Sequence, residues 1–127
     1  MNEHLNSNHK LTAIRGATTS EGDTVSFIKE AVIELIQEFI SLNELNKENI
    51  ISITFTVTKD LTSCFPAAIA RTHFNFDSVA FLDCQQMIVP NDISLCIRMM
   101  ALVNLKSNCK PVHPYLKGSA KLRPDRC

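Results

Sequence analysis

The stretch CIRMMALVNL, residues 96–105, decides the fold, because a mostly apolar run of this length is either a buried strand or a buried helix segment. Its periodicity alone does not distinguish the two, and we interpret it as a long strand. Arg98 stands inside the run, and a guanidinium among apolar neighbours is costly unless an anion pairs with it. The partner of Arg98 is therefore either a structural carboxylate or an anionic ligand.

Around this strand the sequence alternates between helical and extended patterns. Apolar residues recur at spacings of three and four from Val25 to Leu42, which is helical periodicity, and Asp23 or Thr24 is a suitable N-cap. The stretch ISITFTV, residues 51–57, alternates apolar and polar side chains as a half-buried strand does. The other expected elements are a strand at 11–14 followed by a turn at 15–19, a helix at 66–74 opened by Pro66, a strand at 79–82, a loop at 106–111, and one or two strands within 112–122.

This order predicts one α/β domain in which helices pack against a mixed β-sheet. Residues 1–10 are polar and are expected to form an N-terminal extension, followed by the domain at 11–127. Of the 127 residues 45% are apolar and the net charge is zero, so neither a nucleic-acid binder nor a disordered acidic segment is expected. No stretch reaches the roughly 20 apolar residues that span a bilayer, and residues 1–10 lack the apolar core of a secretory signal. These features favour a cytoplasmic protein that does not enter a membrane.

The sequence lacks the signatures of metal, nucleotide and nucleophilic chemistry. It contains no Walker loop, no G-x-G-x-x-G and no metal-ligand spacing of His, Cys and carboxylate residues, so we expect no metal and no cofactor. The five cysteines are odd in number and form no C-x-x-C pair, so reduced thiols are expected. Nothing around Cys64 indicates activation of its thiol, and His73 and His113 have no obvious partner in the sequence.

The arginines are the informative polar residues. Four of the five adjoin apolar segments instead of lying in solvated charge runs, namely Arg15, Arg71, Arg98 and Arg123. Because arginine forks suit carboxylates and phosphates, these residues indicate a site for a small anion, without acid–base or metal machinery.

Six short motifs then occur in order along the chain. They are IRGATT at 14–19, FPA at 65–67 followed by Arg71, QQM at 85–87, CIRMM at 96–100, the H-x-Y of His113 and Tyr115, and LRPD at 122–125. Together they resemble the Bacillus-type monofunctional chorismate mutases, and the resemblance covers residues 11–125. It implies an α/β trimer-type (pseudo-barrel) assembly, a homotrimer with three clefts between subunits. It also implies a cofactor-independent isomerase that rearranges chorismate to prephenate, in the shikimate pathway to phenylalanine and tyrosine.

The resemblance further implies roles for individual residues. Arg98 matches the arginine that contacts the breaking ether oxygen and a carboxylate, Arg15 matches a carboxylate clamp, and Tyr115 matches a phenol that binds a carboxylate. Arg71 and Arg123 match outer arginines that favour entry of the dianion or hold the C-terminal segment. The side chains expected to line the cleft are Phe65, Ala67, Leu82 and Leu122.

Three positions depart from the family pattern. Ala68 stands where many members have a lysine, Asp83 where a cysteine is usual, and Gln86 where a glutamate contacts the hydroxyl group of the substrate. We hypothesise that the carboxylate is relocated, so that Asp83 supplies the charge and Gln86 only a hydrogen bond. Their odd spacing on a strand directs the two side chains to opposite faces, so they would meet only across a subunit interface. The alternative is that Asp83 is a solvated strand-end residue and the enzyme is impaired.

Two other functions remain open from the sequence. One is a non-catalytic trimeric module that binds a small dicarboxylate in the same cleft, and the neutral Gln86 is its best support. The other is a RidA-like imine hydrolase, whose trimeric clefts also use arginine for a carboxylate, although the IRGATT and LRPD motifs speak against it. Loss of chorismate above the uncatalysed rate separates all three functions.

Overall fold

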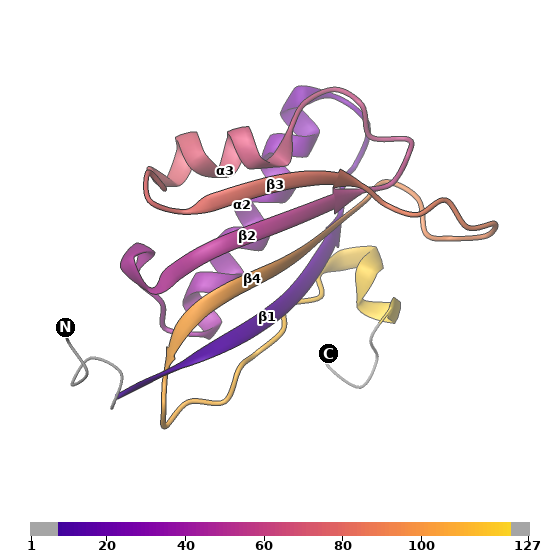
Figure 1. Cartoon of the computed structure of the whole chain (residues 1–127). Coiled ribbons are helices and arrows are strands. Elements are labelled where there is room, and N and C mark those ends of the chain that lie inside the picture. The colour runs from indigo at the N-terminus through magenta and orange to yellow at the C-terminus, as the bar shows by residue number, and fades with distance from the viewer. Residues whose placement is uncertain (1–7, 123–127) are drawn as a thin grey trace.

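The computed structural model describes residues 8–122 as a four-stranded sheet with both α-helices on one of its faces (Figure 1). The strands hydrogen-bond in the order β1-β4-β2-β3. We call the sheet surface that neither α-helix covers the open face. In chain order the elements are β1 (His9–Thr19), α2 (Val25–Leu42), η1 (Lys47–Asn49), β2 (Ile50–Val57), α3 (Pro66–Phe74), β3 (Ala80–Gln85), β4 (Cys96–Lys106) and η2 (Lys117–Leu122).

β4 is a central strand of the sheet, which confirms the interpretation of residues 96–105. It pairs antiparallel with β1 on one side and with β2 on the other. The odd-numbered residues from Ile97 to Leu105 are buried in the core that α2 and α3 share with the sheet. Because side chains alternate along a strand, Arg98 and Met100 point to the open face.

The two helices begin and end as their sequences predict. The hydroxyl of Thr24 caps α2 by accepting a hydrogen bond from the Phe27 N–H at 3.0 Å. Asp23, the other candidate cap, instead accepts hydrogen bonds from the N–H groups of Thr62 and Ser63 at 2.9 and 3.0 Å. α3 occupies the predicted residues and connects β2 with β3, which run parallel, so the predicted mixed sheet is confirmed.

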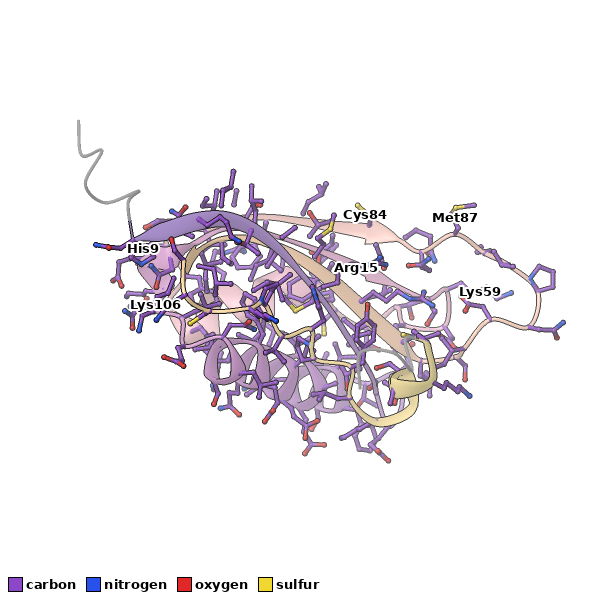
Figure 2. All side chains as sticks on the ribbon, turned by 90° about the horizontal axis from the view of Figure 1, so that it is seen from below. His9, Arg15, Lys59, Cys84, Met87 and Lys106 are labelled. Atoms are coloured by element: carbon purple, nitrogen blue, oxygen red, sulfur yellow. The ribbon has the colours of Figure 1, made fainter. Side chains whose placement is uncertain are left out.

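The predicted turn at 15–19 is wrong, because β1 continues through it to Thr19. Each of these residues pairs with a residue of β4, from Met100 to Cys96. The strand also begins earlier than predicted, at His9, which pairs with Lys106 at the far end of β4 (Figure 2). A β-carbon on Gly16 would lie 2.8 Å from the Pro114 carbonyl oxygen, so glycine is needed where the C-terminal segment crosses β1.

The predicted strands within 112–122 are also wrong. This segment makes one bridge to β1, in which Ala17 donates to the Pro114 carbonyl and accepts from the Leu116 N–H, each at 2.9 Å. Pro114 has no N–H for a longer ladder, and Lys117 has a left-handed φ of 52° that turns the chain into η2. The segment therefore lies beside the end of β1 without extending the sheet (Figure 1).

Within residues 8–122, no helix is long and apolar enough to cross a bilayer. Residues 1–7 of the predicted extension lie outside the described residues, as does Arg123.

Candidate active site

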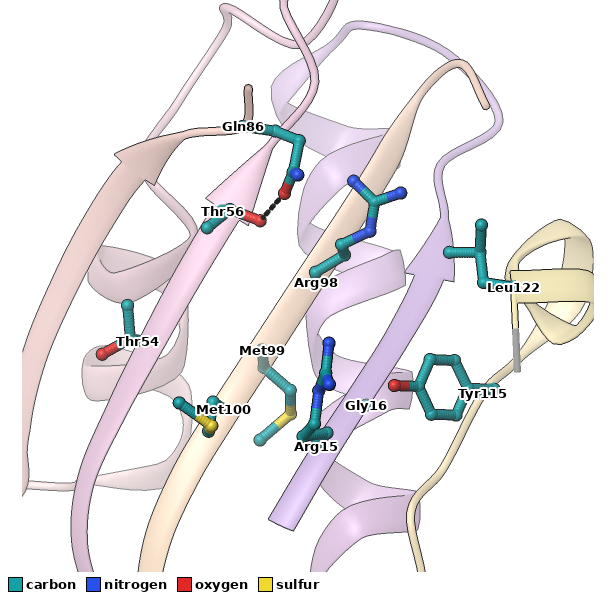
Figure 3. A pocket seen from close by; sticks show the side chains of 10 residues that line it. All are labelled: Arg15, Gly16, Thr54, Thr56, Gln86, Arg98, Met99, Met100, Tyr115 and Leu122. Carbon is teal, nitrogen blue, oxygen red and sulfur yellow. Dashed lines mark hydrogen bonds between the residues drawn. The ribbon is translucent and has the colours of Figure 1, made fainter. Parts of the chain in front are cut away.

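A cavity of about 680 Å³ lies on the open face over β1, β4 and β2 (Figure 3). The strand register brings its walls together, because Arg15 pairs with Met100 while Arg98 pairs with Thr56 and Ala17. We call this cavity the arginine cleft. Its lining residues are Arg15, Gly16, Thr54, Thr56, Gln86, Arg98, Met99, Met100, Tyr115 and Leu122.

Among residues 8–122, two guanidinium groups and no carboxylate line the arginine cleft. The Tyr115 ring lies across from Arg15, with its hydroxyl directed toward that side chain (Figure 3). The C-terminal segment that carries Tyr115 is fixed to β1 at this level, since the Arg15 N–H donates to His113 Nδ1 at 3.0 Å. A cleft with this excess of positive charge suits an anion with more than one carboxylate.

Arg98 is a mostly buried side chain of the cleft and forms an ion pair. Its side chain is 22% exposed, and Nη2 lies 3.3 Å from Oδ1 of Asp92. Its Nη1 is buried and has no hydrogen-bond partner among the described residues. A buried cationic donor without a partner is costly, so this nitrogen is available to a ligand in the cleft.

Gln86 follows the end of β3 and turns its side chain into the same cleft. Its N–H donates to the Val57 carbonyl at 2.8 Å, which continues the register of β3 by one residue. The Thr56 hydroxyl donates to Gln86 Oε1 at 2.6 Å. The oxygen is engaged by this hydroxyl, and the amide nitrogen lies on the side of Arg98 (Figure 3). Gln86 offers the cleft a hydrogen-bond donor.

The other predicted site residues lie around a second cavity of about 350 Å³ at edge strand β3 and the start of α3. We call it the edge cavity. Phe65 and Leu82 are 71% and 59% exposed there. Within one chain the predicted site is thus divided between two cavities, with Gln86 in the first and Asp83 in the second. The edge cavity is lined by Phe65, Ala67, Ala68, Arg71, Phe81, Leu82 and Asp83.

Asp83 has a structural contact that the sequence analysis did not foresee. Its Oδ1 accepts a hydrogen bond at 3.1 Å from the Ala67 N–H, in the first turn of α3, where the N-cap Phe65 has no side-chain acceptor. Burial raises the pKa of Asp83, while the Ala67 N–H and the Arg71 guanidinium act in the opposite direction. Asp83 is therefore half-buried and bonded to the helix, and the description of it as a solvated strand-end residue is wrong.

Sequence reasoning missed Thr54, Thr56 and Asp92. The alternation in ISITFTV contained a signal for the two threonines, because it placed them together on the polar face of a strand. Asp92 closes a turn in the β3–β4 connection, six residues before Arg98 in sequence, and no sequence pattern linked the two.

Neither metal nor thiol chemistry gains support from the site. Within residues 8–122, no three His, Cys, Asp or Glu side chains are grouped so that they could hold a metal ion. Burial raises the pKa of the Cys64 thiol, and Asp23 and Asp83 raise it further, so the thiolate form is disfavoured.

Comparison with known proteins identifies the family. The family model of chorismate mutase type I matches residues 11–126. The chain belongs to this family. It is 39% identical to chorismate mutase AroH of Thermus thermophilus over 117 residues, which cover 91% of this chain and 95% of the relative. It is 32% identical to chorismate mutase AroH of Bacillus subtilis strain 168 over 116 residues, which cover 91% of each.

A solved chorismate mutase has the same fold. The chorismate mutase Cth-682 from Clostridium thermocellum superimposes with a TM-score of 0.81 at 39% identity, covering 87% of this chain and 98% of that one. The predicted resemblance and the α/β fold are thereby confirmed, and the chain is an isomerase of the chorismate mutase class. The dicarboxylate-binding module and the imine hydrolase find no support in these similarities.

Proposed function

We propose that the arginine cleft binds chorismate and rearranges it to prephenate in the cytoplasm, on the route to phenylalanine and tyrosine. The observation that carries this proposal is Nη1 of Arg98, a buried cationic donor in the arginine cleft. Within residues 8–122 this nitrogen has no hydrogen-bond partner, and no carboxylate of these residues lines the cleft. Chorismate carries two carboxylates and an ether oxygen, which are the acceptors that such a cleft lacks.

The reaction needs little chemical participation from the protein. In one concerted step the ether C–O bond breaks and a new C–C bond forms, while electron pairs shift around the ring of reacting atoms. No proton, nucleophile or external electron is required. The protein must hold a flexible dicarboxylate in its compact conformer, which lowers the entropic part of the barrier. It must also place positive charge at the ether oxygen as negative charge develops there.

The cleft residues divide these tasks between them. Arg98 donates to the ether oxygen and to one carboxylate, since a planar fork reaches two acceptors at once. Arg15 and Tyr115 bind carboxylate groups from the opposite wall. Leu122 covers the apolar part of the ligand at the end of η2. Arg123, which lies outside the described residues, is assigned with Arg71 to entry of the dianion or to holding the C-terminal segment.

We further propose a homotrimer in which the edge cavity of one subunit faces the arginine cleft of the next. Phe65 and Leu82 are large exposed apolar side chains beside Arg71, as expected for residues that a partner subunit covers. Leu11 and Met100, at 61% and 53% exposure, lie on the open face and add to the apolar surface available to a partner. Sedimentation as a monomer at micromolar concentration would contradict both the trimer and the shared cleft.

Across such an interface, Asp83 of one subunit supplies the carboxylate at the hydroxyl end of chorismate, and Gln86 of the next supplies a hydrogen bond. Support comes from the opposite directions of the two side chains, one toward α3 and one into the arginine cleft. Ala68 and Ala67 lie at the same end of the edge cavity and leave room for the ligand.

The test of this function is the loss of chorismate in the presence of purified protein, with the uncatalysed rate subtracted. We expect saturable turnover and formation of prephenate in equal amount. Binding of chorismate without turnover would instead identify a dicarboxylate-binding module. The matched control is the Arg98→Ala protein, which keeps the fold and loses the donor.

A further inference from the structure

The β3–β4 connection carries one carboxylate that touches the arginine cleft from outside. Nη2 of Arg98 donates to Oδ1 of Asp92 at 3.3 Å, and the same oxygen accepts the Ile93 N–H at 2.8 Å. Asp92 itself lies in a turn, since its N–H donates to the Val89 carbonyl at 3.2 Å and Asn91 has a φ of 66°. The carboxylate thus has a defined direction even though the connection is exposed.

Both ends of this connection are fixed to β2 and the residues after it. Gln86 bonds to Val57 at the start of the connection. At its end the Leu95 N–H donates to both carboxylate oxygens of Asp60, at 3.1 and 3.0 Å, and Asp60 accepts the Thr58 hydroxyl at 2.6 Å. The two ends of the connection that carries Asp92 are therefore held by β2 and the residues after it, beside the strand that carries Arg98.

This anchoring has a directional consequence for the guanidinium of Arg98. The guanidinium is planar, so a contact that fixes Nη2 restricts where Nη1 can point. In this chain the fixed nitrogen faces Asp92, and the other is buried without a partner among the described residues. Within residues 8–122, Asp92 provides the only carboxylate that pairs with Arg98, because the cleft contributes the neutral Gln86.

We propose that Asp92 is a positioning residue of the mutase reaction, which holds Nη2 of Arg98 so that Nη1 is directed at the reacting oxygen. This inference rests on the proposed function, in which Arg98 touches the substrate. Asp92 contacts no substrate itself, because it lies outside the lining of the arginine cleft. The opposite role would be competition, in which Asp92 occupies Arg98 until a substrate carboxylate displaces it.

The kinetic test compares Asp92→Ala, Asp92→Asn and the unmodified protein. Loss of the anchor in Asp92→Ala should lower kcat about tenfold and change KM by less than about twofold. A misdirected donor weakens binding of the transition state more than it weakens binding of the substrate. Asp92→Asn keeps an oxygen acceptor and should lose less. The control is Asp77→Asn, which removes the same charge from the α3–β3 connection and should leave both constants unchanged. An unchanged kcat in Asp92→Ala overturns the proposal, and a lower KM at unchanged kcat overturns it in favour of competition.

A second measurement does not depend on turnover. In ¹⁵N NMR spectra of the guanidinium groups, assigned with Arg98→Lys, the anchored Arg98 should show slow rotation with separate Nη signals. In Asp92→Ala these signals should merge, and in Asp77→Asn they should not. If the unmodified protein fails to convert chorismate while its Nη signals are separate, the proposed function fails and the anchoring stands. If the two Nη signals of Arg98 are already averaged in the unmodified protein, the positioning role is overturned.

Discussion

The two faces of the sheet are built from the same strands and differ in what their side chains contact. The face toward α2 and α3 is closed by apolar side chains, and Ile14, Phe55 and Val103 are completely buried there. The open face carries Arg15 and Arg98, and Nη1 of Arg98 has no hydrogen-bond partner within residues 8–122. One residue along a strand is enough to change face. The first face stabilises the chain, and the second presents polar groups to a ligand, so substitutions on the two faces should separate stability from activity.

The largest effect should come from the open face. Arg98→Ala should remove nearly all chorismate mutase activity, because losing one preorganised donor to the transition state costs about 3 kcal/mol or more. Arg98→Lys should recover little, since lysine keeps the charge and loses the fork. Steady-state kinetics measure both, and circular dichroism checks that the sheet persists. A Lys variant with near-normal turnover would contradict the role of Arg98.

On the covered face, Ile14→Ala should lower the free energy of unfolding by at least about 2 kcal/mol, from lost burial and the cavity left behind. Its matched control is Leu11→Ala in the same strand, where the side chain is 61% exposed on the open face. That change should cost the isolated chain less than about 1 kcal/mol. Urea unfolding below the concentration at which subunits associate compares the two. Equal losses in the free energy of unfolding for Ile14→Ala and Leu11→Ala would show that the two faces contribute alike to stability.

Substitutions of Asp83 and Gln86 test the proposal that the edge cavity of one subunit and the arginine cleft of the next act together. Asp83→Asn should lower turnover about tenfold, because it removes the carboxylate charge near the developing cation. The amide oxygen can still accept the Ala67 N–H, so α3 should remain capped. Adding Gln86→Glu should restore the rate by returning a carboxylate to the cleft. If Asp83→Asn leaves turnover unchanged, the relocation of the charge is wrong.

The smallest effect concerns the pH dependence of stability. The folded pKa of Asp83 is raised by burial, so the folded chain binds this proton more tightly than the unfolded chain does. Its contribution to the free energy of unfolding is therefore full below the ordinary value of 3.8 and declines as the pH rises through the folded pKa. Asp83→Asn should flatten that decline in urea titrations taken upward from pH 3.8. Equal slopes of the free energy of unfolding against pH in the two proteins would contradict this contribution of Asp83.

The elements with clear periodicity could be predicted from the sequence, and those defined by distant partners could not. The repeat from Val25 to Leu42 and the alternation at 51–57 gave α2 and β2 almost residue by residue. The polar residues 15–19 read as a turn because nothing local reveals that β4 pairs with them. The residues 112–122 read as strands because their single bridge and the turn at Lys117 depend on contacts with β1.

The candidate site divides in the same way. Arg98 was identifiable because a guanidinium in an apolar run needs a partner, and Tyr115 entered only through the family motifs. The contact between Asp83 and the start of α3 could not be predicted from the sequence. It depends on the register of β3, which brings Asp83 to the N–H of Ala67, sixteen positions earlier in the chain. Asp92 was missed for a related reason, since a turn has no period from which the direction of a side chain can be read.

The separation of β1 and β4 in sequence has a consequence for how the chain is made. The two strands lie side by side, yet residues 20–95 must be added by the ribosome between them. At about 5–20 residues per second, the synthesis of these residues takes roughly 4–15 s, and β1 has no partner strand during that time. Until then neither the sheet nor the crossing of the C-terminal segment at Gly16 can be completed. The N-terminal strand therefore takes its place in the sheet only after β4 has been synthesised.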